Sequence, residues 1–262
     1  MIFDFHVHSN NSFDSKEKII ITCEEALKKG ISDLAFTEHF SVDENKKTFG
    51  SMDFKKYFSE IDEAKSKFPS MNIYVGLELC EPHLKIEDFK KELKELPLDF
   101  VLGSIHNIGE KGLRTTAHFY NSTKCYEAYF NEVLNMVSMA DFDIAAHIDL
   151  MARYAYDSVG GYDFSEHREV IEEILKKIIS RDKGIEINTS GLRNSLKSVH
   201  PKIEIVQLYK DLGGKIITIG SDAHKASDVG EGCNEALRLI EDLGFEYTYT
   251  FKNRQAMANK IK

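Results

Sequence analysis

Two histidines, His6 and His8, lie one residue apart at the end of the first apolar run, and the carboxylate Asp14 follows them. Because side chains alternate between the two faces of a strand, both imidazoles are expected to point the same way. Imidazoles on one face can hold one metal ion, or two ions that lie close together. The motif therefore predicts metal binding at the end of the first strand.

Other histidines and carboxylates occupy equivalent places further along the chain. Six of the ten histidines stand at or just beyond the end of an expected strand, and carboxylates share these places. The expected ligands are His6, His8, Asp14, His39, Glu78, His106, His147, Asp222 and His224. Six histidines and three carboxylates exceed what one tetrahedral zinc needs. We therefore expect two or three divalent ions that share bridging carboxylates.

Several neighbouring residues receive supporting or structural interpretations. Asp4 shares a face with the first two histidines and is expected to accept a hydrogen bond from a ligand imidazole. Glu38 precedes His39 and points away from it, as a packing or supporting acid. Cys80 shares a face with Glu78, where a buried structural thiol is favoured over a soft metal ligand. The remaining histidines, expected on solvated helices or loops, are His83, His118, His167 and His200.

Apolar runs alternate with amphipathic stretches along the whole chain, and these elements must position the ligands. Strands are expected at 2–8, 33–39, 73–79, 99–106, 143–148, 184–190 and 215–224, with a short one at 245–251. Helices are expected near 16–29, 53–67, 85–95, 123–140, 164–182, 199–212 and 227–243. Such alternation predicts a parallel α/β sheet, either open or closed into a barrel. The carboxyl ends of its strands share one rim, so the ligands should converge there.

Length and composition describe one ordinary globular domain covering residues 1–262, with 42% hydrophobic residues and a formal charge of −9. No run of lysine and arginine indicates a nucleic-acid surface. No apolar run approaches the roughly 20 residues that a membrane span needs. The first residues do not resemble a signal peptide, and four scattered cysteines are typical of reduced thiols. We therefore expect a cytoplasmic protein.

Six short motifs resemble, in the same order, those of the PHP (polymerase and histidinol phosphatase) superfamily. They are HVHS at 6–9, TEHF at 37–40, GLE at 76–78, GSIH at 103–106, AHID at 146–149 and SDAH at 221–224. The length and INTSGLR at 187–193 are most similar to the histidinol-phosphate phosphatases. The resemblance implies a distorted (β/α)7 TIM-like barrel and a trinuclear centre of zinc, iron or manganese.

Transferring the ligands of that family onto the matching positions assigns three ions. The first would be held by His6, His8, Glu78 and Asp222. The second would be held by Asp14, His39 and His224, although some relatives have a histidine where this chain has Asp14. The third would be held by Glu78, His106 and His147, with Glu78 bridging two ions.

The resemblance also implies an activity, the hydrolysis of L-histidinol phosphate to L-histidinol and phosphate in histidine biosynthesis. A hydroxide bridging two ions would attack phosphorus in line. Arg153 and Arg193 could complete the phosphate site, because guanidinium groups match phosphate oxygens. The proton for the leaving alkoxide would come from Asp222, His224 or a metal-bound water.

Two long loops, 40–52 and 107–122, are expected to set substrate specificity. Aromatic side chains on them could stack on a flat ring, and His118 is a candidate for substrate contact. The aromatic candidates are Phe40, Phe49, Phe119 and Tyr120.

Three other functions are compatible with a metal-binding barrel. One is a PHP phosphoesterase acting on another small phosphorylated metabolite or a nucleotide. A second is an amidohydrolase, which also begins with two histidines one residue apart, although Glu78 and the Asp222–His224 pair argue against that class. A third is a metal-storage or scaffold protein without catalysis. The sequence does not indicate an oligomeric state.

Overall fold

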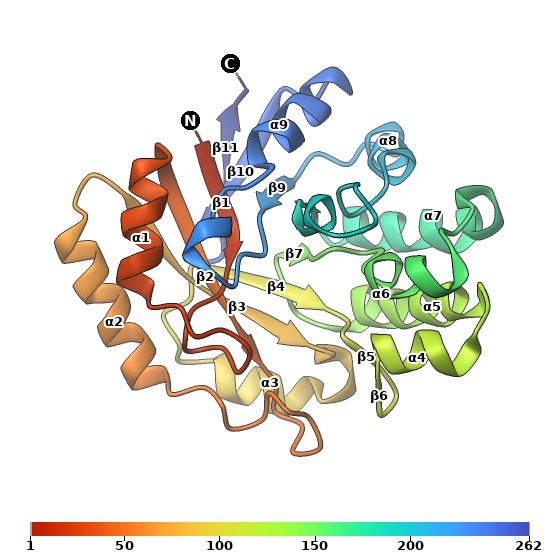
Figure 1. The fold of residues 1–262 in the computed structure, drawn as a ribbon, viewed down its shortest axis with the longest axis horizontal. Helices are drawn as coiled ribbons and strands as arrows, with labels where there is room; N and C mark the ends of the chain where they lie inside the picture. The colour runs from red at the N-terminus through yellow and green to blue at the C-terminus, as the bar shows by residue number, and fades with distance from the viewer. Residues whose placement is uncertain (1, 262) are drawn as a thin grey trace.

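Seven parallel strands form the centre of the molecule, and helices surround them (Figure 1). The computed structural model describes residues 2–261. The strands are β1 (Ile2–Val7), β2 (Ile31–Phe40), β3 (Asn72–Cys80), β4 (Phe100–Ser104), β7 (Ile144–Ala145), β8 (Gly184–Asn188) and β9 (Ile217–Gly220). They pair in this order, and every pairing is parallel. Parallel neighbours require crossover connections, which the helices provide.

The two edge strands, β1 and β9, meet just beyond their carboxyl ends. The backbone N–H of His8 donates to the carbonyl of Ala223 at 2.9 Å, and the N–H of Asp222 donates to the carbonyl of His6 at 2.7 Å. The sheet is therefore a nearly closed barrel, which confirms the expected (β/α)7 TIM-like fold.

Asp4 helps to close this barrel, contrary to its expected role beside a ligand imidazole. Its fully buried carboxylate accepts hydrogen bonds from the backbone N–H groups of Ser221 and Gly230, both at 2.8 Å. It thereby joins β1 to the segment after β9. The prediction is wrong because alternation along a strand determines the face of a side chain and not its partner.

Nine helices cover the barrel within residues 2–261. They are α1 (Ile19–Lys28), α2 (Phe54–Lys67), α3 (Ile86–Leu93), α4 (Leu113–Tyr120), α5 (Lys124–Met139), α6 (Met151–Val159), α7 (Phe164–Ser180), α8 (Ile203–Asp211) and α9 (Cys233–Asp242). Short 3-10 turns lie at Pro82–Leu84, Ser190–Arg193 and Ala226–Asp228. The expected helices are present, whereas α4 and α6 were not predicted. α4 lies within 107–122, which was expected to be a loop. No helix in this range is long and apolar enough to cross a membrane.

Several strands end earlier than expected, and three of them thereby place predicted ligands in turns beyond the sheet. β4 ends at Ser104, β7 at Ala145 and β9 at Gly220. His147 and Asp222 then adopt left-handed backbone angles, with φ of 28° and 55°. Such angles are strained for residues other than glycine and cluster at functional sites. Backbone turns therefore aim these two side chains.

The tail expected to form one short strand is instead an antiparallel hairpin of β10 (Tyr247–Lys252) and β11 (Gln255–Lys260). The ring of Phe251 packs 5.0 Å from that of Phe100, and Arg254 Nε donates to Asp143 Oδ2 at 2.6 Å. Both partners stand at the amino ends of β4 and β7. The hairpin therefore covers the end of the barrel opposite the predicted ligands.

Candidate metal centre

Glu78, near the end of β3, lies at the middle of the convergent histidines. Its side chain is fully buried, and five imidazole nitrogens lie within 3.4 Å of its carboxylate oxygens. These nitrogens belong to His6, His8, His39, His106 and His147. Strands distant in the sequence thus deliver their side chains to one rim, as expected for parallel strands.

The first group of donors consists of His6, His8, Glu78 and Asp222. The Nε2 atoms of the two histidines lie 3.0 Å apart. Asp222 Oδ1 lies 3.8 Å from the first of these nitrogens and 3.5 Å from the second. Donors around a tetrahedral ion lie about 3.4 Å apart, because metal–nitrogen bonds are about 2.1 Å long. The spacing therefore fits one ion shared by these side chains.

The second group consists of Asp14, His39 and His224. Asp14 Oδ2 lies 3.4 Å from Nε2 of His39 and 3.2 Å from Nε2 of His224. Asp14 comes from the segment after β1 and is 34% exposed, so this group lies nearer to solvent than the first. The carboxylate occupies the position from which it could bind an ion together with both imidazoles.

The third group consists of Glu78, His106 and His147. Glu78 Oε1 lies 3.3 Å from Nε2 of His106 and 2.9 Å from Nε2 of His147. The other oxygen, Oε2, faces His6 at 3.2 Å. One carboxylate therefore presents each of its oxygens to a different set of imidazoles, which is the geometry that a bridging ligand requires.

The pKa values of Glu78 and His8 are shifted toward the forms that bind metal ions, whereas neighbouring carboxylates outweigh burial and hold the pKa of His6, His39 and His106 well above the ordinary value. Burial alone would raise the pKa of Glu78, but the imidazoles of His39 and His106 hold this pKa well below its ordinary value. Burial lowers the pKa of His8, and repulsion from His224 and His39 lowers it further. A charged carboxylate and a neutral imidazole are the forms that bind metal ions.

Glu186, on β8, is the carboxylate that orients the imidazole of His6, and it was not predicted from the sequence. Its Oε1 lies 2.6 Å from Nδ1 of His6, and its Oε2 accepts the backbone N–H of His147 at 3.0 Å. A hydrogen bond at Nδ1 turns Nε2 toward the metal position. The available signal was a glutamate inside the apolar strand GIEIN.

Substituting Glu186 with glutamine should lower metal affinity and activity by about 10–100-fold, because the amide orients the imidazole of His6 less strongly. Metal titration of the purified variant, followed by a phosphate-release assay, measures both effects. Glu173→Gln, on the outer surface of α7, is the matched control. Unchanged metal affinity in Glu186→Gln would show that His6 does not depend on this carboxylate.

Glu38 lies behind the cluster and has the supporting role that the sequence predicts. It accepts hydrogen bonds from the hydroxyl groups of Ser9 and Ser12, at 2.5 and 2.6 Å. The Ser12 hydroxyl in turn lies 3.1 Å from Nδ1 of His8. Glu38 is therefore linked to the imidazole of His8 through Ser12.

A cavity of about 940 Å³ opens above the second and third groups. Its walls include loop residues 43–48 and the short hairpin of β5 (Asn107–Ile108) and β6 (Lys111–Gly112). These segments belong to the two loops predicted to set specificity. Asp222 and His224 also line the cavity, so a bound substrate would reach the cluster.

The predicted aromatic contacts are not among the residues that line this cavity. Phe40 is buried and packs 5.2 Å from Phe54, while Phe49, Phe119 and Tyr120 are exposed. The aromatic residues that do line it are Phe13 and Tyr154. Loop length therefore located the cavity wall correctly, whereas residue type alone did not select the right rings.

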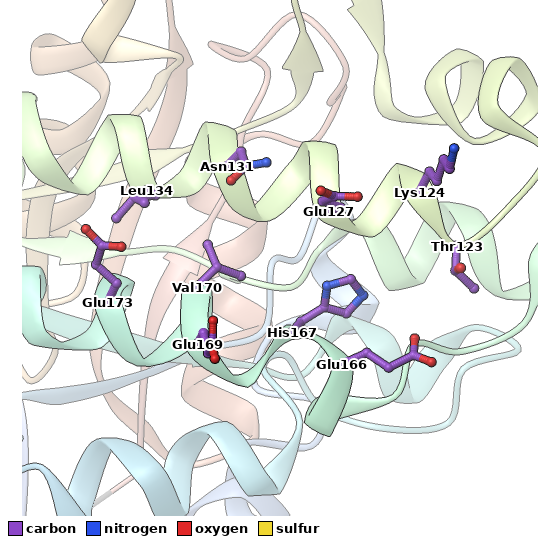
Figure 2. Close-up of a pocket in the computed structure, with 10 residues that line it drawn as sticks. All are labelled: Thr123, Lys124, Glu127, Asn131, Leu134, Glu166, His167, Glu169, Val170 and Glu173. Carbon is purple, nitrogen blue, oxygen red and sulfur yellow. The ribbon is translucent and has the colours of Figure 1, made fainter.

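A second cavity, of about 590 Å³, lies in the outer helical layer between α5 and α7 (Figure 2). Figure 2 shows Glu127 on α5 and Glu166 on α7 on either side of His167. None of the nine predicted ligands lines it. The cavity at the barrel rim is therefore the one associated with the cluster.

The four histidines expected to be solvated have different environments. His200 is fully buried, with Nδ1 2.6 Å from Asp149 Oδ1. His83 is also buried, with Nε2 3.1 Å from Glu132 Oε1. These two predictions are wrong, because each imidazole is buried and has a carboxylate partner, which is buried for His200 and half-buried for His83. His167 is half-buried, and His118 is exposed on α4 and does not line the cavity at the rim.

The two predicted arginines flank Asp222 in different ways. Arg153 lines the cavity, and its Nη1 donates to Asp222 Oδ2 at 3.1 Å. Arg193 Nη2 donates to the carbonyl of Ser221 at 2.6 Å. Its Nη1 is buried and has no hydrogen-bond partner among the described residues. A buried guanidinium N–H without a partner is uncommon. Arg193 is not among the residues that line the cavity at the rim, whereas Arg153 is.

A parallel α/β barrel whose rim gathers buried histidines around a two-sided carboxylate defines the class of metal-dependent hydrolases. The PHP domain family matches residues 4–190, which is most of the chain. This protein belongs to the PHP domain family.

Proteins of known sequence and structure are similar over almost the whole length. The histidinol-phosphatase of Lactococcus lactis is 31% identical over 98% of this chain and 97% of its own. A Clostridium acetobutylicum protein named "probable histidinol-phosphatase" is 32% identical over 92% of this chain and 94% of its own. The crystal structure of the L. lactis histidinol phosphate phosphatase, with zinc, L-histidinol and phosphate, superposes with a TM-score of 0.87. That pair is 27% identical and covers 98% of both chains.

Proposed function

We propose that this protein is a metal-dependent phosphomonoesterase that hydrolyses L-histidinol phosphate to L-histidinol and phosphate. The observation that carries the proposal is Glu78, whose two oxygens face different sets of imidazoles below an open cavity. The similarity to histidinol-phosphatases over nearly the whole chain supports the choice of substrate.

The donor groups fit two to three divalent ions. The two Nε2 atoms of His6 and His8, 3.0 Å apart, would repel each other if both were bare lone pairs, so a cation between them is favourable. Nitrogen and oxygen donors suit zinc, iron or manganese, and the L. lactis structure contains zinc. When bound, such ions would activate a water molecule and polarise the phosphoryl oxygens.

The protein side chains hold and orient the phosphoryl group. Arg153 lines the cavity and donates to the carboxylate of Asp222. Arg193 donates to the backbone carbonyl of Asp222, and its Nη1 is buried without a partner among the described residues. Guanidinium groups at these positions would bind phosphoryl oxygens and stabilise the charge that develops on them. Asp222 and His224 both line the cavity and are the candidates for delivering a proton to the leaving alkoxide.

Phosphate release from a panel of small phosphomonoesters, with metal analysis of the same sample, tests the proposal. We expect L-histidinol phosphate to have the highest kcat/KM. A higher kcat/KM for a nucleotide or another phosphorylated metabolite would support the proposed reaction but contradict the proposed substrate. No phosphate release from any ester by the metal-loaded protein would refute the function.

Arg193→Ala should lower kcat/KM for phosphomonoesters by about 10²-fold, because one donor to the transferring phosphoryl group is lost. Bound metal should be unchanged, since Arg193 Nη2 donates to the backbone carbonyls of Ser221 and Asp222 and not to the carboxylate of Asp222. Steady-state kinetics and metal analysis separate the two effects. Arg238→Ala, on α9, is the control. Equal kinetics in the two variants would show that Arg193 has only a structural role.

The four cysteines, all free and buried, are compatible with a reducing compartment. We therefore propose that the protein acts in the cytoplasm on a small phosphorylated metabolite.

A further inference from the structure

Cys80 stands at the metal centre without belonging to any of the three donor groups. It is the last residue of β3, two positions after Glu78, so strand alternation directs both side chains to the same face. Cys80 is 4% exposed and lines the cavity at the barrel rim. The thiol is therefore sheltered from bulk solvent but open to the space above the cluster.

Two of the ligand imidazoles surround this thiol. Cys80 Sγ lies 3.8 Å from Nδ1 of His39. The donor atoms of His39, Cys80 and His106 all lie within 4.8 Å of one another. His106 also belongs to the group with Glu78 and His147. Cys80 is not part of that latter group, so an ion that the sulfur reaches would lie among His39, Cys80 and His106, with a zinc–sulfur bond of about 2.3 Å.

The other three cysteines have no comparable surroundings. Cys23 and Cys125 are fully buried in the apolar core, and Cys233 is buried at the start of α9. None of them lines the cavity. A role in packing is sufficient to explain these three thiols, whereas packing does not explain why Cys80 lies between two metal-ligand imidazoles.

We propose that Cys80 is a thiolate ligand of the ion that His106 binds. The inference rests on the metal centre of the proposed function. As the sulfur–metal bond forms, the thiol proton passes to solvent, and no electrons are transferred. A soft sulfur donor among nitrogen and oxygen donors favours zinc or cobalt over manganese at this position. Cys80 would thereby set the metal preference of one of the ions.

Cobalt substitution provides a direct test, because thiolate bound to Co²⁺ produces an intense near-ultraviolet charge-transfer absorption that imidazole and carboxylate ligands do not. We expect this absorption in the fully Co²⁺-loaded protein and in the control Cys23→Ala. Cys80→Ser should lose it while retaining the weaker visible absorption of bound Co²⁺. An identical near-ultraviolet spectrum in Cys80→Ser, or no such absorption in the loaded wild-type protein, would overturn the proposal.

Metal competition gives a second readout. Cys80→Ser should lower the zinc affinity of one site by at least about tenfold, with a much smaller effect on manganese. Equal losses for both metals would indicate a structural role and contradict the assignment. Failure of the wild-type protein to bind any Co²⁺ or Zn²⁺ would overturn the metal centre itself. Binding without a sulfur signal would overturn only the role of Cys80.

Discussion

Glu78→Gln should lower the rate of phosphate release by about 10³-fold and should also reduce the amount of bound metal. The amide has almost the shape of the carboxylate but lacks its charge, and it cannot offer an anionic oxygen to both sets of imidazoles. A loss of about 4 kcal/mol of transition-state stabilisation corresponds to this factor. Phosphate-release kinetics and elemental analysis of the same preparation measure both effects.

The structure offers a matched control for this variant. Glu95→Gln makes the same chemical change on a side chain that is 86% exposed, so its activity and metal content should equal those of the wild-type protein. Circular dichroism of Glu78→Gln should show a folded barrel, because the substitution is nearly isosteric. A folded Glu78→Gln protein with full metal content and full turnover would show that Glu78 is not a bridging ligand.

Removing the metal ions should abolish activity and lower the thermal stability of the protein. Glu78 and Asp222 are buried carboxylates, and without cations their charges are balanced only by neighbouring imidazoles and Arg153. A ligand present at about 1,000 times its Kd stabilises the folded state by about 4 kcal/mol. For a chain of this size the loss corresponds to a decrease in Tm of roughly 10 °C.

Chelation followed by calorimetry tests this prediction, and adding zinc back supplies its control. Readdition should restore both the Tm and the activity, which separates metal loss from irreversible unfolding. The His6→Ala variant should already have a lowered Tm that responds less to chelator. An unchanged Tm and full activity after complete metal removal would exclude a metal role in both stability and catalysis.

The fold and most of the cluster could be predicted because they depend on local regularities. The alternation of strands and helices predicts a parallel sheet, and parallel strands place their carboxyl ends at one rim. His6 and His8 therefore needed no tertiary information to be associated with Glu78. The alternation alone did not distinguish an open from a closed sheet, because closure depends on the contact of β1 with the segment after β9. The barrel was expected from the resemblance to the PHP superfamily.

The partners of individual side chains were less predictable. Glu186 was missed, and Asp4 was assigned to an imidazole that it does not contact. Likewise, His200 was expected in solvent, but it is buried against Asp149. In each case the residue's own segment provides its direction, while the partner comes from a segment distant in the sequence. A hydrogen bond between such segments cannot be recognised from the sequence pattern of either segment alone.

The sequence by itself determined the type of element at most positions, the residues at the strand ends and the donor atoms available there. Only the tertiary structure decided how these donors are grouped, which oxygen of Glu78 faces which imidazole, and which loop residues line the cavity. The physical reason is the distance along the chain over which each kind of interaction acts. Secondary structure follows from side-chain periodicity over a few residues, whereas a metal centre requires ångström-scale agreement among segments separated by more than two hundred positions.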